Sequence, residues 1–255
     1  MKLQYPSILV LVVALLIGCS PKVEAPPKSS GSGDTAAAPD KPGVSSADSA
    51  EPTVSLAAVP QSARTDAFDY YGLGSTGAMD VEMKTPDQPA RTGSVSFKFD
   101  KIDGDKAHFK VSRTGAVAEI LGDNEGYADA SGVYMTGTSI GTITPDKFLA
   151  LPSNLTPGKT WNLKNKISAN NGQTIAEDSV YKVQGERDVK TKAGVQKALL
   201  VTSTGSATQT SGGTTIKHKY ETKSWYVKGE GPVRFEIILT EAGKAPKTIV
   251  VTQDK

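Results

Sequence analysis

Apolar and polar residues alternate with a period of two along much of the chain after residue 63. Residues 94–99 read Ser-Val-Ser-Phe-Lys-Phe, and residues 108–111 alternate again after the pair Asp103-Gly104. Alternation interrupted by Asp-Gly is typical of a β-hairpin, because the tight turn needs a residue that tolerates positive φ. Further β-prone runs are separated by glycine-containing turns; they span residues 174–185, 195–207, 214–227, 233–240 and 248–252.

These runs predict one all-β domain over residues 63–255, a length sufficient for a sizeable core. Successive strands joined by short turns favour a single antiparallel meander, which forms a curved sheet or an open barrel. Only residues 145–150 are expected to form a helical turn, because Pro145 suits a first helical position.

One predicted strand carries the candidate ligand-facing residues. Within residues 214–226, lysine and glutamate side chains share one face, and the opposite face is predicted to point inward. That inward face carries Ile216, His218, Tyr220 and Tyr226. These side chains either line a binding cleft or are ordinary core residues with satisfied hydroxyls.

The chain opens with a short hydrophobic leader. Met1-Lys2 precedes an almost unbroken apolar stretch over residues 7–17, which suits a signal peptide and is too short to span a membrane. The leader ends in Leu16-Ile17-Gly18-Cys19, which resembles the bacterial lipobox. This resemblance implies a signal peptide over residues 1–18 and lipidation of Cys19, the only cysteine of the chain.

A lipid on Cys19 would make this protein a lipoprotein with a membrane anchor in the cell envelope. In lipoproteins of this class, a diacylglycerol and usually a further acyl chain such as palmitate are attached to the cysteine. Two or three acyl chains make release from the membrane slow, whereas one binds only marginally. Ser20 does not resemble the aspartate that retains many such proteins in the inner membrane, so we expect the outer membrane, with the domain facing the periplasm or the surface.

Residues 19–62 have the composition of a flexible tether. Proline, alanine, serine, glycine, lysine and aspartate dominate, and large apolar residues are almost absent before Val54 and Leu56. Such a segment cannot bury enough surface to offset its ordering entropy. We therefore expect a disordered linker between the lipid anchor and the domain.

Charge and motifs predict no catalytic or cofactor chemistry. The chain has 29 lysines and arginines against 27 acids, without a concentrated basic run, so nucleic acid is not an expected partner. His108 and His218 are far apart in the sequence, and no second thiol occurs. We therefore expect no catalytic residues, no metal and no cofactor.

Two loop-like sequences have alternative interpretations as ligand sites. Residues 100–105 carry oxygen ligands at loop spacing that could hold calcium, but the late glutamate of an EF-hand is missing and a hairpin turn is favoured. Residues 72–77 are glycine-rich without the lysine of a phosphate loop, and they also predict a turn.

Three later segments, residues 155–161, 192–198 and 224–234, contain the patterns Gly-x-x-Trp, Ala-Gly-x-x-x-Ala and Trp-Tyr-x-x-Gly-x-Gly-x-Val. Their order resembles that in uncharacterised bacterial envelope proteins of the TapB and DUF3108-like type. The resemblance covers about the last hundred residues and implies a curved antiparallel sheet similar to lipoprotein-carrier folds. Trp161 and Trp225 are predicted to fill the core.

These observations favour a lipid-anchored envelope protein whose β domain binds a hydrophobic ligand such as a lipid. That hypothesis predicts a cavity of several hundred Å³. The main alternative is a structural or protein-interaction module with a filled interior, contacting another envelope protein. A hydrolase is the third hypothesis, and it requires serine or aspartate side chains that converge in a cleft.

Overall fold

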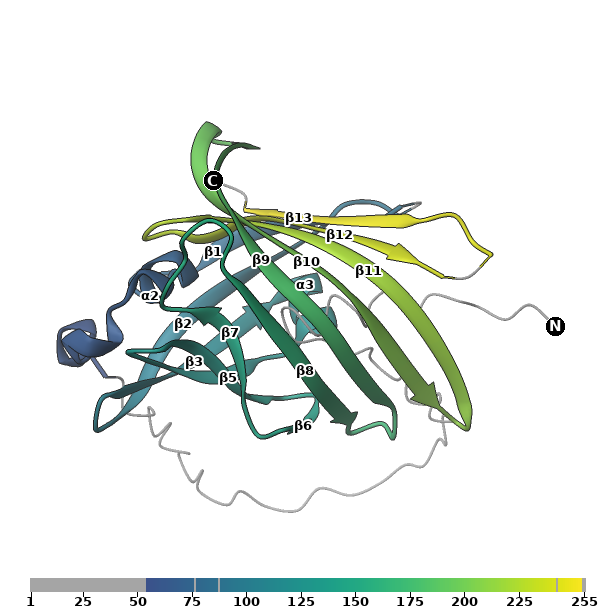
Figure 1. The fold of residues 1–255 in the computed structure, drawn as a ribbon, viewed down its shortest axis with the longest axis horizontal. Coiled ribbons are helices and arrows are strands. Elements are labelled where there is room, and N and C mark those ends of the chain that lie inside the picture. Colours follow the sequence, from purple (N-terminus) through teal and green to yellow (C-terminus); the bar gives the residue numbers. More distant parts are fainter. Residues whose placement is uncertain (1–53, 76, 87, 242, 254–255) are drawn as a thin grey trace, which may run out of the picture.

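The computed structural model describes residues 54–75, 77–86, 88–241 and 243–253. The predicted signal peptide, Cys19 and most of the predicted linker lie outside these residues. Thirteen antiparallel strands make up most of the described chain (Figure 1). Their bounds are β1 Met79–Lys84, β2 Arg91–Asp103, β3 Lys106–Thr114, β4 Asn124–Asp129, β5 Gly132–Thr138, β6 Gly141–Thr144, β7 Phe148–Pro152, β8 Thr160–Ala169, β9 Thr174–Thr191, β10 Gly194–Ser211, β11 Thr214–Val227, β12 Gly231–Thr240 and β13 Lys247–Gln253.

All strands except β7 form a closed barrel in which sequence neighbours are mostly sheet neighbours. Two pairings close the ring: β1 pairs with the last strand, β13, so that Val81 lies opposite Gln253, and β4 pairs with β5. The antiparallel all-β prediction is confirmed, but the prediction of an open barrel or curved sheet is wrong. Closure removes the exposed sheet edges that a linear meander would leave.

The predicted turns and strands agree closely with the structure in the second half of the chain. Strand β11 has the expected bounds, Thr214–Val227, and its inward and outward residues alternate as predicted. The β2–β3 hairpin also forms as expected, with Asp103 opposite Lys106 and Gly104 at φ 62°. The oxygen-rich residues 100–105 are therefore part of a hairpin.

The helical elements differ from the sequence prediction. Residues 145–150, expected to form a helical turn, lead from Pro145 into strand β7, which pairs with β5. The described helices are instead α2 (Asp66–Tyr71), α3 (Gly115–Leu121) and the short 3-10 turns η1 (Leu56–Ala58) and η2 (Gln61–Ala63). None of these helices is long and apolar enough to cross a membrane.

The segment before β1 packs against one end of the barrel. The Val54 amide donates to the Phe99 carbonyl oxygen at 3.0 Å, and Val59 and Ala63 are buried. Phe68 of α2 stacks on the Phe99 ring with centroids 5.8 Å apart. The packed chain therefore begins before residue 63, and residues 54–62 belong to the barrel rather than to the predicted linker.

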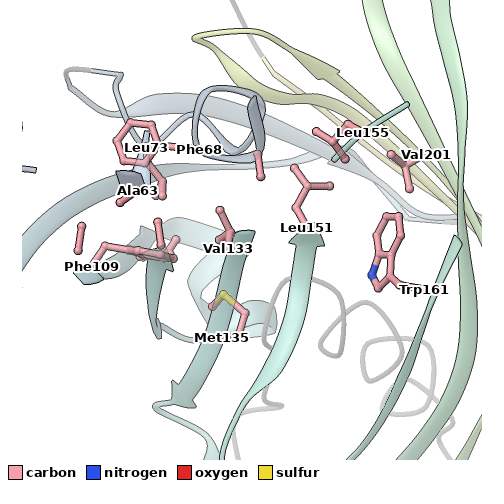
Figure 2. Packing of buried hydrophobic residues seen from close by; sticks show 14 of the residues in the cluster. Ala63, Phe68, Leu73, Phe109, Val133, Met135, Leu151, Leu155, Trp161 and Val201 are labelled. Carbon is pink, nitrogen blue, oxygen red and sulfur yellow. The ribbon is translucent and has the colours of Figure 1, made fainter. Parts of the chain in front are cut away.

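Two large clusters of buried apolar side chains fill the interior. One cluster joins the N-terminal segment to β2, β3, β4, β5, β7, β8 and interior residues of β9 and β10 (Figure 2). In Figure 2, Val133 and Met135 of β5 lie beside Leu151 of β7. The second cluster joins β1, β6, β12, β13 and α3, which contributes the buried Val117. Val95 and Phe148 pack against both clusters.

Candidate ligand cavity and buried polar cluster

A cavity of about 120 Å³ lies inside the barrel, lined by residues of both apolar clusters. Its wall is largely apolar; examples are Val81, Val111, Ile143, Leu163 and Phe235. The volume is smaller than the several hundred Å³ expected for a binder of a whole lipid chain. An enclosed apolar cavity of about 150 Å³ can hold a molecule the size of benzene, so this cavity accepts a small apolar group.

Several polar side chains also line the cavity. Tyr71 of α2 donates its hydroxyl hydrogen to the Met135 sulfur at 3.4 Å, and burial raises the pKa of Tyr71. Arg113 of β3 is 9% exposed and lines the same cavity. Tyr226 of β11 also lines the cavity, and burial raises its pKa, with a smaller contribution from Tyr71. The cavity therefore combines apolar walls with a few groups able to orient a ligand.

The four residues proposed from the sequence as ligand-facing are distributed differently. Tyr226 is half-buried and lines the cavity. Tyr220 and His218 are buried on the same face of β11, but neither belongs to the cavity wall. Ile216 is half-buried near the far end of the strand. Only Tyr226 therefore meets the cavity, and the contact of the four residues with a ligand stays a prediction.

A buried acidic cluster lies next to Tyr220. The Tyr220 hydroxyl donates to Glu177 Oε1, and the Ser179 hydroxyl donates to the same oxygen at 3.2 Å. Glu177 is 2% exposed, and burial raises its pKa to about 7, although the two hydroxyl hydrogen bonds oppose this rise. Burial also raises the pKa of Tyr220. The cluster therefore joins a buried acid on β9 to hydroxyls of β9 and β11.

Strand β8 adds a second buried polar side chain to this cluster. Asn165 lies directly opposite Glu177 in the β8–β9 ladder, and it is 4% exposed. Neither side-chain atom of Asn165 has a hydrogen-bond partner in the structure, and Glu177 Oε2 has none either. Leaving such atoms unpaired costs about 1–3 kcal/mol each, so this cluster weakens the core locally. Leu163 and Ile167, the inward neighbours of Asn165, both line the cavity.

Sequence reasoning missed Arg113 and Glu177. A signal for Glu177 was present, because Ile175, Glu177 and Tyr181 alternate with exposed residues in one run, which places the acid on the inward face. No comparable signal marked Arg113, since it follows the alternating segment 108–111 that served to define the hairpin. Of the two tryptophans, Trp161 is buried as predicted and stacks on Tyr181, whereas Trp225 is only half-buried beneath Arg234.

Comparison with solved structures supports the fold. A candidate lipoprotein of Parabacteroides distasonis aligns with a TM-score of 0.50 and 12% identity, over 73% of this chain and 97% of that protein. A candidate exported protein of Bacteroides fragilis, described as having a YmcC-like fold, aligns with a TM-score of 0.46 and 12% identity, over 70% and 93%. At this identity, the first likeness shows that the two proteins share a fold and nothing further.

Searches at the sequence level found no relative. No protein-family model matches the chain, and no curated protein matches it. The resemblance to the TapB and DUF3108-like envelope proteins therefore stays a prediction.

Proposed function

We propose that this chain is a lipid-anchored protein of the cell envelope whose barrel binds a small hydrophobic ligand without catalysis. The observation that carries the proposal is the largely apolar cavity between the two core clusters. The leader ending in Cys19 and the fold shared with a candidate lipoprotein are compatible with this location. The partners we propose are the membrane, through the lipid on Cys19, and a lipid or its apolar end.

Our proposal for which membrane holds the lipid anchor depends on the residue after the cysteine. Ser20 favours the outer membrane, with the barrel held by its tether on the periplasmic side or at the surface. Metabolic labelling with an alkyne analogue of palmitate tests the anchor. We expect the wild-type chain and a Ser20→Ala variant to be labelled and a Cys19→Ala variant to remain unlabelled; labelling of Cys19→Ala would contradict lipidation at this residue.

Native mass spectrometry tests ligand binding. A soluble chain that begins at Ser20 keeps every described residue, and we expect its spectrum to show a bound mass that organic extraction removes. Ala150 lines the cavity, so Ala150→Leu adds three carbons to the wall and should reduce the bound fraction. Ala193→Leu is the matched control, because Ala193 is exposed in the turn between β9 and β10. Equal occupancy in both variants would contradict binding in this cavity.

The alternative proposal is a structural or protein-interaction module of the envelope. The observation that favours it is the small volume of the cavity, because the two apolar clusters fill most of the interior. A wild-type chain that carries no removable mass and gains no stability from lipids would favour this alternative.

A further inference from the structure

Three buried side-chain oxygens on strands β8 and β9 have no hydrogen-bond partner within the described part of the chain. They are Asn165 Oδ1, Glu177 Oε2 and the hydroxyl oxygen of Tyr181. All three side chains are buried. Buried polar atoms are nearly always paired, because an unpaired atom has lost its water without gaining another partner. Three such oxygens on neighbouring strands therefore need an explanation.

The register of β8 and β9 brings these side chains together beside the cavity. Asn165 lies directly opposite Glu177 in the ladder, where Cβ atoms are about 5 Å apart. The inward neighbours of Asn165 on β8, Leu163 and Ile167, both line the cavity. Tyr181 lies on the same inward face of β9 as Glu177 and also lines the cavity. The three unpaired oxygens are therefore at the border of the cavity.

The charges that act on these side chains favour a cation at this border. Burial and then the charge of Glu177 raise the pKa of Tyr181. Burial raises the pKa of Glu177, and the neighbouring Asp178 adds to this rise. The positive charge of Arg113 acts on another part of the wall, where it lowers the pKa of Tyr71 against the larger effect of burial. A carboxylate in an apolar interior attracts a cation strongly, because the local dielectric constant is low.

We infer that the cavity binds a primary amine with a short apolar tail, with its ammonium head at Glu177 and Asn165. The inference rests on the proposed function and names the chemical class of its ligand. An ammonium group has three donors and no acceptor, and carboxylate, amide and hydroxyl oxygens can each accept one of its hydrogens. At about 120 Å³, the cavity suits a tail of about six carbons. Glu177 and Asn165 lie beside the cavity wall, so the head group reaches them when the Tyr181 side chain rotates.

The test compares three ligands that share one tail and differ in head group. The ¹⁵N-labelled chain that begins at Ser20 is titrated with hexylamine, hexanol and hexanoate at about pH 8, where Glu177 is largely ionised and an alkylamine is protonated. Affinities are taken from amide shifts. We expect hexylamine to bind about tenfold more tightly than hexanol, and hexanoate more weakly than both.

The other outcomes separate this inference from the proposed function. Equal binding of hexylamine and hexanol would indicate that the unpaired oxygens hold water, and it would overturn the amine inference while leaving the hydrophobic site intact. Tighter binding of hexanoate than of hexylamine would also overturn the amine inference. No binding of any of the three would overturn both proposals.

Substitutions test the two residues that would hold the head group. In Glu177→Gln, we expect the ratio of hexylamine to hexanol affinity to fall to about one, because the charge is lost. In Asn165→Leu, the ratio should fall less, because one acceptor is lost and the charge is kept. Glu186→Gln and Asn162→Leu are the matched controls, since Glu186 is exposed on β9 and Asn162 is exposed on β8. A wild-type ratio in Glu177→Gln would overturn the inference, and the wild-type titrations decide it if a variant fails to fold.

Discussion

The Tyr220 hydroxyl reaches across strand β10 and donates a hydrogen bond to Glu177 on β9. Tyr220 lies opposite Gly205 of β10 in the β11–β10 ladder, and Gly205 lies opposite Ser179 of β9. Because Gly205 has no side chain, the phenol can pass over the middle strand. This contact connects three strands inside the barrel.

Removal of the Tyr220 hydroxyl should destabilise the fold. Tyr220→Phe leaves Glu177 with only the Ser179 donor, and we expect a loss of about 1–3 kcal/mol in the free energy of unfolding. Urea denaturation followed by fluorescence measures this loss. Tyr134→Phe is the control, since Tyr134 is half-buried and stacks on Tyr127; a similar loss in both variants would show that the contact with Glu177 is not the cause.

The raised pKa of Glu177 predicts a pH dependence of stability. Burial raises this pKa from its ordinary value of 4.5 to about 7, so between these values the folded state binds more protons than the unfolded state. Stability should therefore fall as the pH rises from about 4.5 to 7 and then level off, with a contribution of about 3 kcal/mol.

Comparison with Glu177→Gln isolates this contribution, because glutamine has no proton to lose and can still accept from Tyr220 and Ser179. We expect the variant to be more stable than the wild type at pH 8 and to lose this advantage at pH 4. Parallel stability curves for the two proteins across this range would contradict a raised pKa.

A side chain at position 205 should disturb the same contact. A Cβ atom built on Gly205 would lie 2.5 Å from the Ser179 Cβ and 2.7 Å from the Asp178 carbonyl oxygen. Backbone must shift to relieve such contacts, so we expect Gly205→Ala to cost about 1–3 kcal/mol of stability in urea denaturation. At Gly74, a Cβ would meet only Phe68 at 3.7 Å, so Gly74→Ala should be near neutral. Equal effects of the two substitutions would count against the steric argument.

Residues 54–63 should contribute to the stability of the barrel. A chain that starts at Arg64 loses the Val54–Phe99 hydrogen bond and the buried Val59 and Ala63. We expect its melting temperature to lie several degrees below that of a chain that starts at Val54. Chains that start at Ser20 and at Val54 should melt together; equal melting of the Arg64 chain would show that the segment does not stabilise the fold.

The sequence pattern predicted secondary structure correctly where that structure depends on residues close together in the chain. Strand β11 and the β2–β3 turn were predicted because side chains alternate every second residue and because Asp103-Gly104 suits a tight turn. The same reasoning failed at residues 145–150, since Pro145 is compatible with a helix start and with the entry to a strand. It also failed for α2 and α3, whose short sequences give no clear helical period.

By itself, the sequence determined that the described chain is antiparallel and all-β, and which residues of β11 face inward, since both depend on neighbours within a few residues. Only the tertiary structure decided that the sheet closes, because the pairing of β1 with β13 brings together residues more than 160 positions apart, such as Met83 and Val251. It also decided that Arg113 lines a cavity and that Glu177 is buried beside Tyr220. The surroundings of these two charged side chains depend on the strands packed around them, and those strands come from distant parts of the chain.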